Sequence, residues 1–393
     1  MSNLQRNSKL LLYGQALSFM GDYCVLPALL ILSTYYQDYW VTSGVIIVRS
    51  IPMILQPFLG VWVDRFSRVK IMLWTDIIRG FIFLSVTLLP SGEYPSFFLL
   101  LLLLSYGSGV FFNPARLAVM SSLGDDIKRV NTLFAKATTL CVIAGALIGA
   151  GFLAVGSVKS AVAFNALTYF VSAIFIGRMN IQSEASLKIR KAKMVESFLQ
   201  GMKEIGRNPF VLNAVLTMMA MSLVCGVVYS YFPIVSQSIG EGEIGNFILT
   251  VTIGLGGFLG ALLVNRWGFN SDRGLVYFIV LSLTSLSVFM YSSSFSIAFI
   301  AAVGLFVALE YGEVLAKVKV QENSGNEIQG RIFAVSEALI GLAISVGSTL
   351  VNFASTLVIL SLLIISMLGL FVHTKLVNKL YVTTSNEQSS TIL

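Results

Sequence analysis

The stretch GVWVDRFSRVK, at residues 60–70, joins two strongly apolar segments and is the shortest connection in the first half of the chain. It contains one acidic residue, Asp64, and three basic residues, Arg65, Arg68 and Lys70. Short loops rich in Lys and Arg resist transfer across a membrane. We therefore expect this stretch to lie on the cytoplasmic side of a bilayer, between two membrane-spanning helices.

The composition is typical of an integral membrane protein. Of the 393 residues, 56% are hydrophobic and 11% are charged, whereas soluble domains carry about 25% charged residues. The mean hydropathy is +0.84. Backbone polar groups in lipid must be satisfied within the protein, which leaves helices or a closed barrel. The apolar runs are long, rich in Leu and not alternating, so they predict all-α spans of about 20 residues each.

The distribution of charge indicates how these helices are oriented. We expect twelve spans, at about 9–35, 41–63, 71–89, 96–118, 132–155, 159–176, 211–232, 244–264, 275–291, 296–318, 332–353 and 357–372. Nearly all Lys and Arg outside the spans fall in alternate connections, which predicts a multi-pass protein of a cell membrane, such as a bacterial inner membrane, with both termini cytoplasmic. The net charge of +7 is then a topology signal and does not indicate nucleic-acid binding.

The pattern predicts four parts. A six-helix bundle occupies 1–178, a cytoplasmic amphipathic linker 179–208, a second six-helix bundle 209–373 and a disordered cytoplasmic tail 374–393. Apolar residues recur at helical spacing in the linker, as expected of a helix that lies on a membrane surface. A solvated connection between two bundles is the alternative and does not conflict with it.

The two halves repeat one design. The sequence PFLGVWVDRF at 57–66 resembles GFLGALLVNRW at 257–267, and RVNTLFA at 129–135 resembles QGRIFAV at 329–335. Both pairs are separated by about 200 residues. Such a repeat predicts two pseudo-symmetric bundles with a site between them at mid-membrane.

The loop at 60–70 resembles the motif G-x-x-x-D-R-x-G-R-R, which major facilitator superfamily transporters carry between their second and third helices. Gly60, Asp64, Arg65 and Arg68 match it, whereas Ser67 and Val69 replace a glycine and a basic residue. The resemblance implies the major facilitator fold and transport by alternating access. It also implies a gating role for these four residues.

In that role Asp64 would interact with Arg68 and with the start of the eleventh helix near Arg331, where the helix dipole favours a carboxylate. This contact would hold the two halves together on the cytoplasmic side.

Further stretches resemble the macrolide-efflux and related drug:proton antiporter branch. They are GQALSFMGD at 14–22, RSIP at 49–52, FFNPARLAVMSSL at 111–123 and GRIFAVSEALIGLA at 330–343. The resemblance implies export of lipophilic or cationic small molecules, such as macrolides, by proton antiport. One alternative is an exporter or flippase of an endogenous siderophore or lysolipid. Another is a membrane sensor that does not transport and acts through the linker or the tail.

Asp22 and Arg49 are charges inside the first two predicted spans. A charge at a helix centre costs roughly 2.5–3.5 kcal/mol on insertion scales, so it is expected to face a cavity or a partner. Adjacent antiparallel helices could bring the two residues together. One hypothesis is that Asp22 carries a coupling proton or contacts a cationic substrate. The alternative is a structural ion pair of Asp22 with Arg49 that fixes helix packing. Nearer the cytoplasmic ends, Asp76 and Glu337 are expected to form salt bridges with Arg79, Arg68 or Arg331.

Glu310 and Glu313 lie three residues apart in the tenth predicted span and so share one helix face. Two carboxylates in a cavity of low dielectric constant cannot both ionise cheaply. We therefore expect one of them to bind and release protons during transport. The alternative for Glu313 is an ion pair with Lys317, one helical turn away.

The resemblance places a substrate cavity between the first, fourth, seventh and tenth helices. Candidate lining residues are Tyr23, Phe112, Asn113, Tyr229 and Tyr311, because aromatic walls suit lipophilic or cationic ligands. Ordinary packing is the alternative for each aromatic residue.

No nucleotide-binding loop of the form G-x-x-x-x-G-K-[ST] occurs, so direct use of ATP is not expected. The three cysteines lie inside apolar spans and suggest neither disulfides nor a metal site. We expect a monomeric transporter in the lipid bilayer that is not an enzyme, has no cofactor, and binds a small molecule and protons.

Overall fold

The computed structural model describes residues 3–63, 66–121, 127–155, 157–180, 194–267 and 271–390. Of the predicted gating motif, Asp64, Arg65 and the surroundings of Gly60 lie outside what is described, whereas Arg68 begins a helix. The described part consists of helices joined by short connections. In order they are α1 (Asn3–Thr34), α2 (Tyr39–Val63), α3 (Arg68–Leu88), α4 (Pro95–Ser121), α5 (Ile127–Val155), α6 (Val158–Gly177), α7 (Met194–Arg207), α8 (Pro209–Ser238), α9 (Gly242–Trp267), α10 (Ser271–Met290), α11 (Phe295–Glu322), α12 (Asn326–Phe353) and α13 (Thr356–Ser390).

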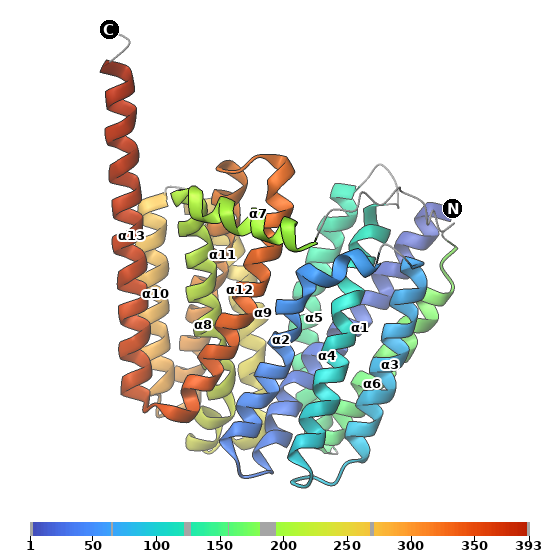
Figure 1. Ribbon diagram of the computed structural model, residues 1–393. Coiled ribbons are helices and arrows are strands. Elements are labelled where there is room, and N and C mark those ends of the chain that lie inside the picture. The colour runs from blue at the N-terminus through green and yellow to red at the C-terminus, as the bar shows by residue number, and fades with distance from the viewer. Residues whose placement is uncertain are drawn as a thin grey trace.

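The helices form two bundles of six, α1–α6 and α8–α13, and α7 lies between them in sequence (Figure 1). In the first bundle α1 packs against α5 and α6, and α3 packs against α4 and α6. In the second bundle α8 packs against α12, and α11 packs against α9 and α10. The bundles meet where α2 contacts α12 and α5 contacts α9. This arrangement confirms the predicted all-α architecture with two pseudo-symmetric halves.

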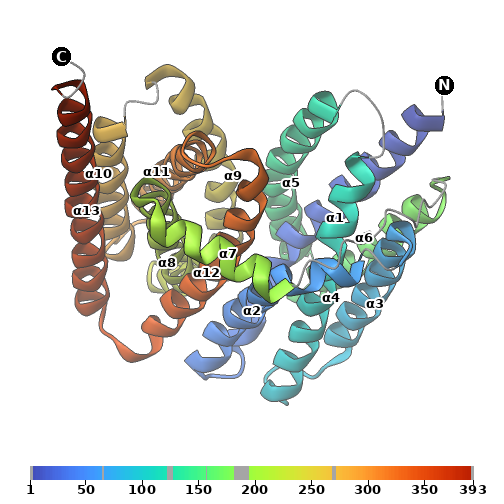
Figure 2. The ribbon, with the colours of Figure 1, turned by 45° about the horizontal axis from the view of Figure 1, so that its top comes forward.

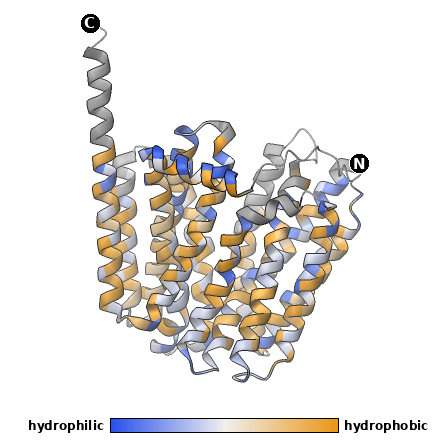
Figure 3. Ribbon diagram, in the orientation of Figure 1, coloured by the Kyte–Doolittle hydropathy of each residue, from blue (hydrophilic) through white to orange (hydrophobic). Residues whose placement is uncertain are grey.

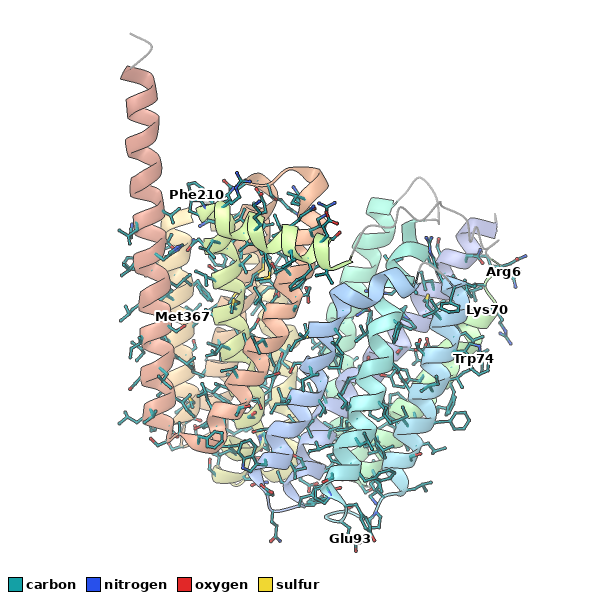
Figure 4. All side chains as sticks on the ribbon, in the orientation of Figure 1. Arg6, Lys70, Trp74, Glu93, Phe210 and Met367 are labelled. Atoms are coloured by element: carbon teal, nitrogen blue, oxygen red, sulfur yellow. The ribbon has the colours of Figure 1, made fainter. Side chains whose placement is uncertain are left out.

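Both termini lie at one end of the molecule, which we call the terminus end (Figure 1). Arg6 and Lys70 lie near this end, and Glu93 lies at the opposite end, which we call the loop end (Figure 4). The amphipathic helix α7 is at the terminus end and contacts α12, α8 and α2 (Figure 2). Its apolar residues Val195, Leu199 and Met202 are exposed, as expected of a helix that rests on a membrane surface.

Hydrophobic residues cover the long sides of both bundles (Figure 3). Among the described residues, nine helices are long and apolar enough to cross a membrane. The other three bundle helices, α2, α5 and α10, have shorter apolar segments at 40–56, 140–155 and 276–290. Large apolar side chains such as Phe81, Ile300 and Leu357 are exposed on the outside, where a soluble protein would carry polar residues. The molecule is therefore an integral membrane protein.

Helix α13 ends at Ser390 and so extends beyond residue 373, where the second bundle was expected to end. Residues 374–390 contain neither Gly nor Pro, so nothing in the sequence interrupts a helix that has already begun. Extending a formed helix costs far less than nucleating a new one. Of the predicted linker, α7 accounts for 194–207, and 181–193 lie outside the described residues.

Two glycines allow α8 and α12 to touch along their backbones. A Cβ atom at Gly226 would lie 2.1 Å from the carbonyl oxygen of Ile344, and one at Gly347 would lie 2.1 Å from that of Leu223. Replacing Gly226 by Ala is therefore expected to lower the free energy of unfolding by about 1–3 kcal/mol, the range for overpacking a core. Thermal unfolding of the purified protein measures this. The control is Gly369→Ala in α13, where a Cβ has no neighbour within 4 Å. An equal loss in both variants would contradict the prediction.

Candidate functional site

The described site begins with Asp22 of α1, which is held by two other helices of the first bundle. The Tyr169 hydroxyl of α6 donates a hydrogen bond to Asp22 Oδ1. Arg79 of α3 places Nη2 at 3.5 Å from the same oxygen. The Arg79 guanidinium also lies 4.2 Å from the centre of the Tyr169 ring, a cation–π distance. Three helices thus converge on one carboxylate.

The ion pair between Asp22 and Arg49, one of the two alternatives for these residues, does not form, because Asp22 pairs with Arg79. The reason is the order of helices in space. Along its length α1 packs mainly against α5 and α6, and only slightly against the next helix in sequence, α2. Since α6 also packs closely against α3, Arg79 is brought to Asp22.

Arg49 of α2 lies where the two bundles meet. It interacts electrostatically with the hydroxyl groups of Tyr23 on α1, Tyr106 on α4 and Tyr229 on α8, and more weakly with Asp22. Tyr23 and Tyr229, two of the predicted lining residues, are therefore brought together around this guanidinium. Tyr229 belongs to the second bundle, so the site includes both halves.

The second bundle contributes carboxylates. Glu310 of α11 faces the glycine-rich side of α9. A Cβ atom placed on Gly260 would lie 2.8 Å from the Cβ of Glu310. Glu313 forms an ion pair with Lys317, the alternative considered for it above. Both of these side chains are about half exposed, at 42% and 48%. Lys317 also interacts with Glu337 of α12. Charged groups therefore lie on α11 and α12 as well.

Other predicted site residues lie elsewhere. Phe112 is buried in a core cluster with Leu11 and Met72, and Tyr311 is buried in the core of the second bundle, so both pack rather than line the junction of the bundles. Asn113 is exposed. Arg331 donates a hydrogen bond to Gln200 of α7.

Asp76 is fully buried in α3, and neither of its carboxylate oxygens accepts a hydrogen bond. Asp76 therefore does not form the salt bridge that the sequence predicted for it. Arg79 interacts with Asp76 through space, but its ion pair is with Asp22.

A row of contacts joins the two bundles from their middle to the loop end, and we call it the seam. The Ser43 hydroxyl of α2 donates to the Ser348 carbonyl and the Asn352 side chain of α12, each at 3.0 Å. The hydroxyls of Ser50 and Ser345 lie 2.8 Å apart.

The seam continues between α1, α5 and α9. The Asn246 side chain donates to the Pro27 carbonyl at 3.1 Å. Phe247 of α9 is fully buried among first-bundle residues, next to Gly149 of α5. Beside these contacts is a cavity of about 260 Å³, lined by both bundles.

At the loop end Tyr35 donates a hydrogen bond to Glu243 across the seam. Burial raises the pKa of the Tyr35 phenol to about 12, and Glu243 acts in the same direction. The Tyr35 phenol therefore stays protonated, and able to donate, beyond the unperturbed pKa of about 10. It loses its proton only as the pH rises through about 12. Tyr35→Phe is therefore expected to weaken the closed seam by about 0.5–1.5 kcal/mol without altering how transport depends on pH. A pH profile of transport that shifts in this variant would contradict the assignment.

Sequence reasoning did not find Tyr106 and Tyr169. The available signal was weak: a tyrosine inside an apolar span needs a partner for its hydroxyl when buried. Tyr169 is 0% exposed, and its hydroxyl is satisfied by Asp22. The sequence alone does not show which carboxylate a buried hydroxyl reaches.

Comparison with known proteins decides the family. A model of the Major Facilitator Superfamily matches residues 11–348. The chain belongs to this superfamily. It is 64% identical over 387 residues to the "Putative bacilysin exporter BacE" of Bacillus subtilis (strain 168), covering 98% of each chain. The protein of the same name from Bacillus amyloliquefaciens is equally similar. A more distant relative, the lysophospholipid transporter LplT of Photorhabdus laumondii, is 27% identical over 45% of this chain and 44% of its own.

Solved structures of transporters share the fold. The nucleoside transporter NupG superposes with a TM-score of 0.70 over 95% of this chain and 100% of its own, at 12% identity. A bacterial homolog of the human lysosomal transporter Spinster, in an inward-facing and unoccupied conformation, gives a TM-score of 0.66 over 98% of each chain, also at 12% identity. This member of the superfamily is therefore a membrane transporter of the major facilitator fold.

Proposed function

We propose that this transporter exports bacilysin, or a small molecule of closely similar chemistry, out of the cell. The observation that carries the proposal is the 64% identity to the BacE proteins along 98% of both chains. The match covers both bundles and the connection between them. We further propose that the protein works as a monomer in the cell membrane, with the terminus end facing the cytoplasm.

The charged residues at the junction favour a polar substrate over a purely lipophilic one. Asp22 and Arg79 form an ion pair in the first bundle, and Arg49 lies beside Tyr229 of the second bundle. Glu310, Glu313 and Lys317 lie on α11. Charged groups inside a membrane face a cavity or a partner. The resemblance to macrolide-efflux proteins predicted lipophilic drugs, and we place them second to bacilysin as candidate substrates.

The seam supports a cycle of alternating access. Its contacts join the bundles between their middle and the loop end. With the terminus end in the cytoplasm, this arrangement closes the outer side. Opening the seam while the terminus end closes would expose the junction to the outside, as in transporters built from two repeats. We propose that proton movement through buried carboxylates drives this exchange.

Efflux of labelled bacilysin from loaded cells tests the proposal. Cells that produce this chain are expected to lose bacilysin faster than cells with an empty vector, and collapse of the proton gradient should abolish the difference. A labelled macrolide serves as the comparison. Equal bacilysin efflux with and without the protein in the membrane would overturn the proposal. Faster efflux of the macrolide alone would support the second candidate.

A further inference from the structure

Asp76 is the most unusual acidic residue among those described. It lies within α3 with 0% exposure, and both of its carboxylate oxygens are buried without a hydrogen-bond partner. The Ser172 hydroxyl of α6 lies near Asp76, but its geometry does not make a hydrogen bond. An ionised carboxylate in such a place is strongly disfavoured, because it has lost its hydration without gaining hydrogen bonds. A carboxylic acid that holds a proton avoids this penalty.

One guanidinium is shared by two carboxylates. Arg79 lies three residues after Asp76, on the same face of α3, and its Nη2 atom is paired with Asp22. Its Nε atom is buried without a partner. Asp22 has both Arg79 and the Tyr169 hydroxyl, so Asp22 is the carboxylate that is stabilised as an anion. Asp76 is left to be neutral, and the three side chains together then carry no net charge.

The groups around Asp76 and Arg79 come from four helices. Those that act on Asp76 are Arg79 of α3, Ser172 of α6 and Asp22 of α1. Tyr169 of α6 and Tyr106 of α4 act on Arg79. Of these, Arg79 is the only cation. The two aspartates differ in their exposure. The Asp22 side chain is 27% exposed, whereas Asp76 is not exposed at all.

We propose that Asp76 is the binding site of the proton exchanged during transport, and that Arg79 is a positioning residue that moves between the two aspartates. The proposal rests on the proposed function, because it names the group that couples transport to protons. In the described state Asp22 is ionised, Arg79 is charged and Asp76 holds the proton. When Arg79 turns to Asp76, the proton leaves Asp76 for Asp22, which is partly exposed and passes it to water. The transfer from Asp76 to Asp22 leaves the total charge of the three groups at zero. Release of the proton from Asp22 to water then lowers this charge to −1, and the next proton to bind restores it.

This assignment differs from the candidates that the sequence suggested. Asp22 already has an ion pair and a hydrogen bond, and Glu313 is paired with Lys317. Glu310 lies against α9 and is only partly buried. Asp76 alone among these four combines complete burial with two unpartnered oxygens.

Infrared spectroscopy of the purified protein tests the site without any substrate. At neutral pH the wild type is expected to show the C=O stretch of a protonated carboxylic acid. This band should be absent in Asp76→Asn and unchanged in the control Glu310→Gln. Because asparagine resembles the neutral acid in shape, Asp76→Asn should also unfold at the wild-type temperature. A band that persists in Asp76→Asn, or an Asp76→Asn protein that fails to fold, would overturn the proposal.

Transport separates this inference from the function on which it rests. In vesicles without a proton gradient, Asp76→Asn is expected to exchange bacilysin for bacilysin as the wild type does. With a gradient, only the wild type should accumulate bacilysin. Gradient-driven accumulation by Asp76→Asn would overturn the role of Asp76. If the wild type itself neither exchanges nor accumulates bacilysin, the substrate assignment fails, and the infrared result still decides whether Asp76 holds a proton.

Discussion

Replacing Arg79 by leucine is expected to lower the free energy of unfolding by about 3–5 kcal/mol, the range for removing one partner of a buried ion pair. Arg79 is 9% exposed and is the cation next to both Asp22 and Asp76. Without it Asp22 keeps only the Tyr169 hydroxyl, and the stacking of the guanidinium on the Tyr169 ring is also lost. Chemical or thermal unfolding of the detergent-solubilised protein measures the effect.

Two further variants show that the loss comes from the unpaired carboxylate. Arg79→Lys keeps the positive charge but not the planar guanidinium, so it should recover part of the stability. The double variant Asp22→Asn with Arg79→Leu removes both charges and should be more stable than Arg79→Leu alone. If the double variant loses the sum of the two single effects, Asp22 and Arg79 are not coupled, and the described ion pair is contradicted.

Replacing Gly149 by valine is expected to slow transport by about 5–150-fold while leaving the protein folded. A Cβ at Gly149 would lie 2.3 Å from the ring of Phe247 and 3.0 Å from the Cys24 carbonyl oxygen. Phe247 is fully buried in the seam, so the added side chain prevents α5 and α9 from closing. Overpacking of this kind costs about 1–3 kcal/mol. A cost of that size changes the equilibrium constant between the closed and the open seam by about 5–150-fold.

The control for Gly149→Val is on the same helix. A Cβ at Gly151 has no neighbour within 4 Å, so Gly151→Val should transport at nearly the wild-type rate. Shortening the opposing side chain offers a second check, because Gly149→Val combined with Phe247→Ala should recover transport. The account of the seam fails if Gly149→Val transports normally, or if Gly151→Val is impaired to the same degree.

The fold could be predicted from the sequence because its signals are local. The length of an apolar run, the charge of a short loop and the repeat of PFLGVWVDRF as GFLGALLVNRW each lie within a few dozen residues. The ion pair between Glu313 and Lys317 was foreseen as an alternative for the same reason, since the two residues are one helical turn apart. The length of α13 beyond residue 373 was not foreseen, because the polar composition of this segment was given more weight than its lack of Gly and Pro.

The partners of the intramembrane charges could not be predicted in this way. Asp22 and Arg49 lie on consecutive helices, but α1 packs against α6, and the partner proves to be Arg79, 57 residues away in sequence. Choosing among the buried arginines requires the order of helices in space, which hydropathy and loop charge do not determine. The isolation of Asp76 is likewise a property of the assembled bundle, because it depends on what α4 and α6 place against α3.

The most direct test of the central claim, that the chain is a proton-coupled bacilysin exporter, is the pH inside energised, inverted membrane vesicles after bacilysin is added. Vesicles that contain the wild-type protein are acidified inside, and bacilysin is expected to raise their internal pH as protons leave in exchange for it. Vesicles with Gly149→Val should respond weakly, and those with Asp76→Asn should not respond. If bacilysin leaves the pH gradient unchanged in wild-type vesicles that contain the inserted protein, the account is contradicted.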